Sequence, residues 1–131
     1  YGALYNWYTV NTGMLCPVGW HVPTYDESWT LANFLGGEIS AGGLIKEKGT
    51  VHWASPNTGA TNQSGFTALP GGARNTDGNF GVAGYGLYWW TSTEIDAVMS
   101  RLNYVLYNDS AFNLGANEKQ FGASVRCIRN E

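Results

Sequence analysis

A stretch of nearly forty residues in the middle of the chain is the feature that most constrains its fold. Residues 50–86 are dominated by Gly, Asn, Thr, Ser and Pro, a composition that by itself is typical of loops or of disorder. Large apolar residues recur along this stretch, and we interpret them as anchors that hold a long ordered loop against the body of the domain. The anchors are Trp53, Phe66, Leu69, Phe80 and Tyr85.

The composition of the whole chain fits such a fold. Aromatic residues make up 15% of the 131 residues and Gly occurs 18 times, whereas charged residues reach only 13%, about half of the roughly 25% found in an average globular protein. The long aliphatic runs that are typical of buried parallel strands are missing. We therefore predict one loop-rich domain over residues 1–131, long enough to bury a core without a structural metal.

Short regular elements are expected before the loop. Residues 3–10 are rich in aromatic and β-branched types and predict an opening strand. Residues 16–23 contain two prolines and a glycine, which exclude a helix and favour an extended or turning segment. Thr24 with Glu27 three residues later has the capping-box spacing of a helix start, and the glycine pair at 36–37 predicts the helix end.

A second helix and four strands are expected in the rest of the chain. The helix is predicted over residues 41–48, although its internal glycine pair is poor helix material. The strands are predicted over residues 88–92, 100–107, 111–114 and 123–129. The two faces of the second strand carry Leu102, Tyr104 and Leu106 on one side and Arg101, Asn103, Val105 and Tyr107 on the other.

Two cysteines lie near opposite ends of the chain. A bond between Cys16 and Cys127 would close a loop of over a hundred residues, which the chain-entropy model values at about 4–5 kcal/mol. Alternation in the last strand puts Cys127 on the same face as Ala123 and Val125, as expected of a cysteine that faces the core. The residues alone leave two alternatives open, a disulfide and a pair of buried thiols.

The charge pattern excludes two classes of partner. The formal net charge is −3, and the seven Lys and Arg residues are scattered, so the basic footprint that nucleic acids require is missing. No apolar run approaches the roughly 20 residues that span a bilayer. We therefore expect neither nucleic-acid binding nor membrane insertion by this domain.

Few residues suit catalysis or metal binding. His21 and His52 each adjoin a tryptophan, and because no further ligands with metal-site spacing accompany them, we interpret both as hydrogen-bonded structural residues. Cys16 and His21 would form a nucleophile pair, but no orienting acid is evident. We predict no catalytic residue and no cofactor. The carboxylates available for acid–base chemistry are Asp77, Glu94, Asp96 and Asp109, and no sequence pattern pairs any two of them.

The segment around Arg74 and the residues after it is expected to be a turn. Its glycines lack the spacing of a phosphate-binding loop, which leaves Arg74 free to pair with a carboxylate such as Glu94. Asn75, Asp77 and Asn79 alternate as calcium ligands do in loops, but Asn-rich turns show the same alternation for conformational reasons. The turn is the simpler interpretation, and calcium remains open.

Six groups of motifs in a fixed order give the chain a family resemblance. They are YGALYNWY at residues 1–8, CPVGWHVPT at 16–24, GATN and SGF within 59–66, ALPGGAR at 68–74, WWTSTE at 89–94 and SVRCIR at 124–129. This order closely resembles the Fibrobacter succinogenes major paralogous domain, which is found in surface and lipoprotein-like proteins of bacteria. The resemblance covers nearly the whole chain.

That family resembles a branch of the superfamily that contains C-type lectins and formylglycine-generating enzymes. The resemblance implies an α+β, C-type-lectin-like fold with two helices, a small twisted antiparallel sheet, long ordered loops and adjacent chain ends. Adjacent ends would bring Cys16 near Cys127, so the resemblance favours a disulfide and an extracellular or cell-surface location.

The resemblance also limits the function. The catalytic members of the superfamily use two cysteines close together in the active site, whereas here one lies near each end of the chain. Sugar-binding C-type lectins use Glu-Pro-Asn or Gln-Pro-Asp together with Trp-Asn-Asp to bind calcium, and none of these motifs occurs here. We therefore expect no enzyme activity, and calcium-dependent sugar binding has no support.

Related domains are the variable proteins of diversity-generating retroelements, in which the stretch before the last strand is mutated at adenines. In this chain that stretch is residues 95–120. The resemblance implies a surface that binds a protein or glycan on a cell or particle surface, with the domain itself on a cell surface or on a phage particle. The alternative is a spacer domain of a surface lipoprotein without a ligand site. The candidate ligand-binding positions are Ile95, Ala97, Val98, Asn103, Tyr107, Asn108, Ser110, Ala111, Asn113, Leu114, Ala116 and Asn117.

Overall fold

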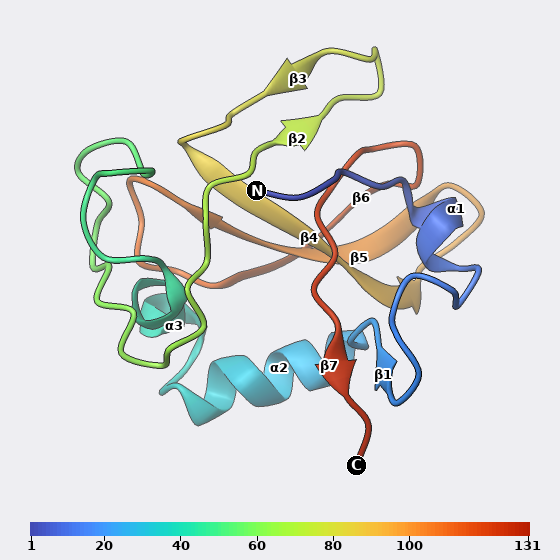
Figure 1. Cartoon of the computed structure of the whole chain (residues 1–131), viewed down its shortest axis with the longest axis horizontal. Helices are drawn as coiled ribbons and strands as arrows, with labels where there is room; N and C mark the ends of the chain where they lie inside the picture. The colour runs from blue at the N-terminus through green and yellow to red at the C-terminus, as the bar shows by residue number, and fades with distance from the viewer.

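The computed structural model describes residues 1–131, which form a mixed fold of three helices and three small antiparallel sheets (Figure 1). The predicted combination of helices with a small antiparallel sheet is confirmed, but there are three helices rather than two. They are α1 (Trp7–Val10), α2 (Tyr25–Phe34) and α3 (Glu38–Ile45).

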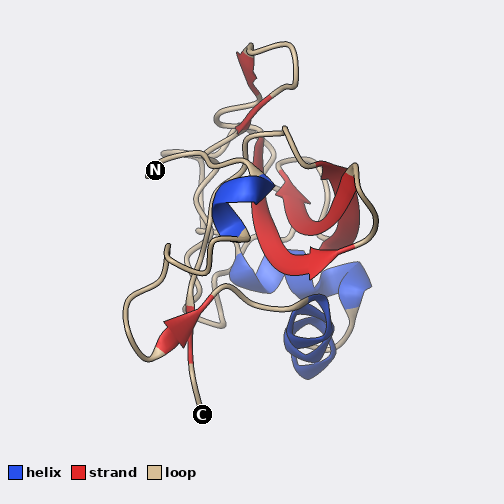
Figure 2. Cartoon of the chain, turned by 90° about the vertical axis from the view of Figure 1, so that its right-hand side faces the viewer, coloured by secondary structure: helices blue, strands red, loops and turns tan.

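The central sheet contains the three long strands in the antiparallel order β4-β5-β6. In two shorter sheets β1 pairs with β7 and β2 pairs with β3. Figures 1 and 2 both show the β2–β3 hairpin projecting from the end of the molecule opposite α2. The strands are β1 (Trp20–His21), β2 (Ala73–Arg74), β3 (Phe80–Gly81), β4 (Gly86–Glu94), β5 (Met99–Leu106), β6 (Asn113–Glu118) and β7 (Ile128–Arg129).

The four strands predicted for the last third of the chain are recovered to different degrees. Residues 88–92 lie within β4, and β5 covers nearly all of residues 100–107. β6 begins two residues after the predicted start at 111 and extends to Glu118. Of residues 123–129, only β7 forms a paired strand, because Ala123 and Ser124 make single bridges to other segments.

The central sheet is buried on both faces, because the side chains of its strands alternate between two hydrophobic clusters. Trp89 packs into the cluster beside α2 and α3, whereas Trp90 packs into the cluster beside α1. Figure 2 shows these helices on different sides of the sheet. In β5, Val105 belongs to the first cluster and Leu102 to the second, so the two faces predicted for this strand are confirmed.

The strand predicted over residues 3–10 is wrong, because a single helical turn replaces most of it. Only Tyr5 forms a β-bridge. The side chain of Asn6 then accepts a hydrogen bond from the backbone N–H of Thr9 and starts α1. This N-cap bond, together with burial of Trp7 on the helix, outweighs the strand preference of aromatic and β-branched residues.

The helix predicted to start at Thr24 is confirmed as α2. Oγ1 of Thr24 accepts from the backbone N–H of Glu27 at 3.2 Å, and Oε2 of Glu27 accepts from the backbone N–H of Thr24 at 2.8 Å. The helix ends before Gly36 and Gly37, which adopt φ values of 98° and 110° that other residues rarely reach. The capping box and the glycine stop therefore set the bounds of α2.

The second predicted helix exists as α3, but it lies three residues earlier than the predicted range 41–48. Its two glycines are points of close contact with neighbouring backbone. A Cβ atom on Gly42 would lie 2.1 Å from the carbonyl oxygen of Ala111, and one on Gly43 would lie 2.3 Å from that of Gly59. The glycine pair therefore weakens the helix locally but allows two loops to pack directly against it.

The long loop between α3 and β4 is ordered as predicted, but only some of its expected anchors are buried. Trp53 is fully buried, and its indole N–H donates to the carbonyl of Ala68 at 2.9 Å. Phe66 is half-buried against the core beside α2. Phe80 and Tyr85 are 73% and 51% exposed, so their predicted role as anchors is wrong.

Lys46, just after α3, is an additional anchor of the loop. Its side chain is fully buried, and Nζ donates to the carbonyl oxygens of Thr58, Leu106 and Asp109 at 2.9, 2.8 and 2.8 Å. Burial lowers the pKa of this amine to about 8, so it remains protonated at neutral pH. One cation thus ties the long loop to the loop between β5 and β6.

The two ends of the chain are joined by a disulfide between Cys16 and Cys127, which are 111 residues apart. The disulfide favoured by the family resemblance is therefore confirmed. The end segments also pair directly, because Tyr5 bridges to Ala123. The two terminal residues themselves lie apart in both Figure 1 and Figure 2, so the expected adjacency holds for the end segments and not for the termini.

Candidate functional site

The predicted ligand-binding positions of residues 95–120 fall into three places. Ile95, Ala97 and Val98 are exposed in the turn between β4 and β5. A second group lies in the loop between β5 and β6, and a third lies on β6 itself. Because β5 and β6 are antiparallel, the turn and the loop lie at opposite ends of β5, about 25 Å apart for a strand of its length. The third group lies on β6, which runs along the sheet between these two ends. The second group is Tyr107, Asn108, Ser110 and Ala111, and the third is Asn113, Leu114, Ala116 and Asn117.

Two of these positions face the interior. Asn103 is completely buried, so the prediction that it is exposed is wrong. Alternation along β5 places it on the face that packs against α2, where its Nδ2 donates to Oγ of Ser28 at 2.8 Å. Leu114 is half-buried against the core.

The other polar candidates have structural contacts. Asp77 accepts from the backbone N–H of Asn79 in the turn of the β2–β3 hairpin, as the turn interpretation predicts. Arg74 does not pair with Glu94. Its Nε donates to a carbonyl in the same hairpin and its guanidinium lies over Phe80, while Glu94 pairs with Lys119 at 2.7 Å.

The predicted histidines are both hydrogen-bonded, His21 to Glu27 and His52 to Glu47. No cluster of three or more His, Cys, Asp or Glu side chains is placed to hold a metal ion. Because Cys16 is bonded to Cys127, its sulfur is not available as a nucleophile beside His21.

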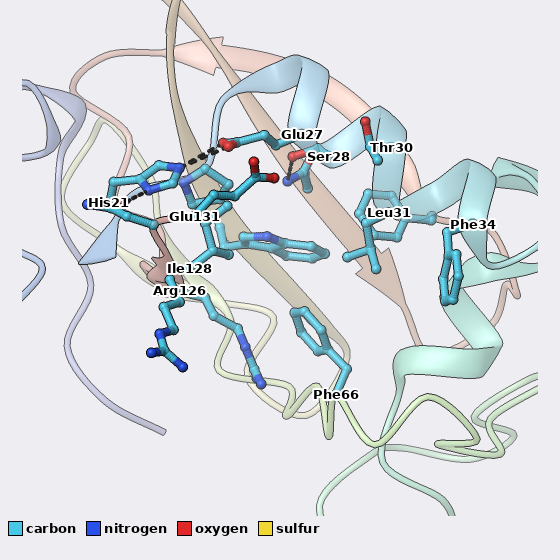
Figure 3. Close-up of a pocket in the computed structure, with 16 residues that line it drawn as sticks. His21, Glu27, Ser28, Thr30, Leu31, Phe34, Phe66, Arg126, Ile128 and Glu131 are labelled. Carbon is cyan, nitrogen blue, oxygen red and sulfur yellow. Dashed lines mark hydrogen bonds and ion pairs between the residues drawn. The ribbon is translucent and has the colours of Figure 1, made fainter. Parts of the chain in front are cut away.

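A cavity of about 720 Å³ lies between α2 and the C-terminal segment of the chain (Figure 3). Its floor is mostly apolar and includes Trp89 and Phe112 from the core, with Leu31 and Phe34 of α2 along one wall. Figure 3 shows His21 and Glu27 at one edge and Arg126 with Phe66 at the opposite edge. The volume is within the range of roughly 300–1,000 Å³ that is typical of small-molecule sites. We call this cavity the α2 cleft.

A buried polar chain lies at the inner wall of the α2 cleft. The hydroxyl of Ser28 donates its single hydrogen to the carbonyl of Thr24 at 3.3 Å, so it accepts from Asn103 and fixes Nδ2 of that amide toward itself. Oδ1 of Asn103 is left buried without a hydrogen-bond partner. Because Asn103 is completely buried, this unpaired oxygen lies behind the surface of the cleft.

At the edge formed by His21, both nitrogens of the imidazole ring have hydrogen-bond partners. Its Nδ1 contacts Oδ1 of Asn130 and its Nε2 contacts the carboxylate of Glu27 at 3.0 Å. Both partner atoms are acceptors, so this arrangement favours the imidazolium form, in which both ring nitrogens donate. The hydrogen bonds to Asn130 and Glu27 accordingly raise the pKa of His21 above its usual value. Burial tends to raise the pKa of Glu27, but hydrogen bonds from Thr24 and His21 outweigh it and lower the pKa.

The opposite edge carries two arginines. The guanidinium of Arg126 lies 3.8 Å from the ring centroid of Phe66, and Arg129 also lines the cleft. Neither side chain forms an ion pair or a hydrogen bond within the chain. Arg126, Phe66 and Trp89 also border a second cavity of about 340 Å³, so they form the partition between the two.

A sequence model described as the Fibrobacter succinogenes major domain matches residues 1–129. The chain belongs to this family. The family resemblance predicted from the motifs is therefore confirmed. No curated protein and no solved structure matches the chain.

Two features of this Fibrobacter succinogenes major domain concern its location relative to the cell membrane. Its disulfide is compatible with an extracellular location, because such bonds persist in oxidising compartments. None of its helices combines the length and the apolar character that crossing a bilayer requires.

The residues of the α2 cleft were not predicted as a site. They come from α2, β4, β5, the residues just before α2, the long loop, the β5–β6 loop and the C-terminal segment, and no spacing in the sequence brings these segments together. The one available signal was Asn103, an amide on the same strand face as Val105. A polar residue on a core-facing position needs a partner or a ligand.

Proposed function

We propose that this chain is a non-catalytic extracellular binding domain with a C-type-lectin-like fold, and that the α2 cleft holds its ligand. The ligand belongs to a protein or glycan on a cell or a particle, as expected from the family. The observation that carries the proposal is a cleft of about 720 Å³ whose surface is mostly apolar and whose edge carries Arg126 and Arg129 without an ion-pair partner. This combination of apolar surface with a few fixed polar groups is typical of binding sites.

The walls of the α2 cleft are rigidly held, which reduces the entropy cost of binding. On one side α2 is fixed by its capping box. On the other side β7 pairs with β1, and the disulfide ties Cys127 to Cys16. A preorganised site of this kind loses little conformational freedom when a ligand enters.

The exposed turn between β4 and β5 is proposed as a second contact surface. Ile95 and Val98 are 43% and 57% exposed there, and both belong to the stretch for which the family resemblance implies diversification. Sequencing the DNA downstream of the gene tests that part, since a near-copy of the 95–120 coding region that differs at adenines would be expected beside a reverse transcriptase.

Titration with phenol, a small apolar probe with a hydroxyl donor, tests the α2 cleft. We expect saturable shifts of backbone NMR signals confined to residues that line the cleft. Leu31→Trp should fill the cleft and abolish these shifts, whereas Asn33→Trp, which adds the same ring at an exposed position of α2 outside the cleft, should leave them unchanged. Thermal unfolding of both variants checks that the fold is retained.

Weak shifts scattered over the surface, without saturation, would overturn the proposal. That result would favour the alternative of a spacer domain without a ligand site. A pattern confined to the β4–β5 turn would assign binding to the second surface instead of the cleft.

A further inference from the structure

We propose that the partner of the α2 cleft is a second copy of this chain, whose β2–β3 hairpin inserts Phe80 between α2 and the C-terminal segment. This inference rests on the proposed function and names the partner. Three features carry it, namely the exposed apolar side chains of the hairpin, an apolar cleft at the opposite end of the molecule, and unpaired charges of opposite sign on the two surfaces.

The β2–β3 hairpin carries apolar side chains that its own domain does not cover. Phe80 and Val82 are 73% and 46% exposed, and Figures 1 and 2 show the hairpin projecting from the rest of the molecule. Val82 has a φ of 55°, which β-branched residues rarely adopt. Its carbonyl accepts from the backbone N–H groups of Tyr85 and Gly86, and these bonds hold the conformation. Exposed apolar side chains gathered on one element are typical of an interaction surface.

The tip of the hairpin is ordered by its own contacts. The guanidinium of Arg74 lies 5.2 Å from the ring centroid of Phe80, and its Nε donates to the carbonyl of Gly78 at 3.1 Å. The side chain of Asp77 accepts from the backbone N–H of Asn79 at 2.9 Å. The ring is therefore presented by a fixed turn, which loses little conformational freedom when it enters a partner.

The α2 cleft presents a surface that suits an aromatic ring. Its lining is mostly apolar and includes Phe34 of α2, which is 84% exposed, and Phe66 of the long loop. The ring centroid of Phe66 lies 6.0 Å from that of Trp89. A cavity of about 720 Å³ is in the range that accepts a drug-sized ligand, so it has room for one aromatic side chain. Burial of such a ring between apolar walls is favourable.

The charges of the two surfaces are complementary. Asp77 at the hairpin tip forms no ion pair, and neither do Arg126 and Arg129 at the edge of the cleft. Asp77 and Phe80 are three residues apart, which limits the distance between their Cα atoms to about 10 Å. In the cleft the guanidinium of Arg126 lies 3.8 Å from the ring centroid of Phe66. A ring that packs against Phe66 therefore lies beside an arginine, as the ring of the hairpin lies beside a carboxylate.

The cleft also contains two carboxylates. Glu27 is already paired with His21. Glu131 forms no ion pair within the chain, and Arg74 of the hairpin carries the opposite charge. The hairpin and the cleft can therefore meet without an excess of like charge.

The positions of the two surfaces determine how copies would assemble. The hairpin and α2 lie at opposite ends of the molecule in both Figure 1 and Figure 2, so the hairpin cannot occupy the cleft of its own chain. Each copy would insert its hairpin into one neighbour and receive the hairpin of another. A contact between two different surfaces forms either a closed ring or an open chain. Because the two surfaces lie at opposite ends, we expect an open chain of domains.

Analytical ultracentrifugation of the intact domain tests the self-association. We expect the wild type to associate as its concentration rises and to form species larger than a dimer, because every complex keeps one free hairpin and one free cleft. Phe80→Ser removes the inserted ring and Leu31→Trp fills the cleft, so each should weaken the association at least about tenfold. Met14→Ser is the matched control, because Met14 is also largely exposed but lies on neither surface. This variant should associate as the wild type does.

Mixing the two weakened variants tests which surfaces meet. Phe80→Ser retains an intact cleft and Leu31→Trp retains an intact hairpin, so together they should form a one-to-one complex that grows no further. Phe34→Asp, at an exposed position of the same wall, repeats the test without changing a residue that packs against the core. Thermal unfolding of each variant checks that the fold is retained.

Asp77→Asn tests the charge contact. The amide keeps an acceptor oxygen for the backbone N–H of Asn79, so the turn should persist. Association of the wild type should weaken as salt is added, because salt screens the attraction between Asp77 and the arginines. Association of Asp77→Asn should be weaker at low salt and less sensitive to salt. Identical association of the variant and the wild type at low salt would contradict the proposed docking.

The outcomes separate the partner from the function. A wild type that remains monomeric at about 1 mM overturns the proposal. So does a wild type that associates while the two mixed variants fail to pair, since the contact then uses other surfaces. If phenol saturates the cleft of a monomeric wild type, the partner is wrong and the binding function stands. If phenol also fails to bind, both are wrong.

Discussion

Lys46 and Asn103 are both completely buried, but their polar atoms are used differently. Nζ of Lys46 donates to three carbonyl oxygens, which accounts for every hydrogen that the ammonium group carries. Asn103 uses only its Nδ2, and its Oδ1 has no partner. The first pattern is that of a fully satisfied structural anchor, whereas the second leaves one buried acceptor unpaired in the interior.

His21 gives the cleft edge a pH dependence that can be measured. Its folded-state pKa lies above 6.5 because Asn130 and Glu27 hold the imidazolium form. The contribution of these His21 contacts to the free energy of unfolding is therefore fully present below pH 6.5. It is lost as the pH rises through the folded-state pKa. An NMR titration should give a pKa above 6.5 for His21, and Glu27→Gln, which keeps the capping geometry, should lower it.

His52→Gln in the same background simplifies the measurement, since His21 is then the only histidine that titrates. A pKa of 6.5 or less for His21 would contradict the prediction. So would a value that Glu27→Gln leaves unchanged.

At the scale of elements, the sequence patterns with a specific hydrogen-bond geometry were the most predictive. The capping box at Thr24 and Glu27 located α2 correctly, because both bonds of the motif depend on residues three positions apart. The strand predicted over residues 3–10 is wrong because the side chain of Asn6 caps a helix start, a local bond that strand propensity does not include. The position of α3 depended on loop backbones packing against its glycines, a tertiary contact that no local pattern reveals.

Thr24→Ala tests the energetic role of the capping box. Loss of the side-chain acceptor at the N-cap should reduce the free energy of unfolding by about 1 kcal/mol, and the melting temperature should fall by roughly 3–5 °C for a domain of this size. Thr30→Ala is the matched control, because this threonine is also exposed and lies within the same helix but caps nothing. Equal losses from both substitutions, measured by thermal unfolding, would show that the cap contributes nothing specific.

At the scale of the whole molecule, the disulfide and the family could be predicted from the sequence, whereas the α2 cleft could not. The motifs that surround Cys16 and Cys127 belong to the family pattern over residues 1–129. The α2 cleft forms where segments far apart in the sequence meet, and the candidate positions of the β4–β5 turn and of the β5–β6 loop lie at opposite ends of β5. Linear motifs predict a family and its cross-link, but a surface assembled from separate segments requires their arrangement in space.

Removing the disulfide tests how far the core alone supports the fold. Cys16→Ser with Cys127→Ser opens a loop of 111 residues, and the free energy of unfolding should fall by about 4–5 kcal/mol in the chain-entropy model. Denaturant unfolding of this double variant beside the wild type measures the loss. A difference of less than about 1 kcal/mol would mean that the unfolded chain is already held compact by other contacts.

The same cross-link determines how the domain responds to a mechanical load. Tension applied to the two ends of the chain passes through residues 1–16, across the bond between Cys16 and Cys127, and out through residues 127–131. The residues between the two cysteines carry none of it. The sheet and α2 therefore belong to a closed ring that a pulling force cannot extend. Residues 128–131, which form the other wall of the cleft, lie on the loaded path, so tension would act on that wall alone.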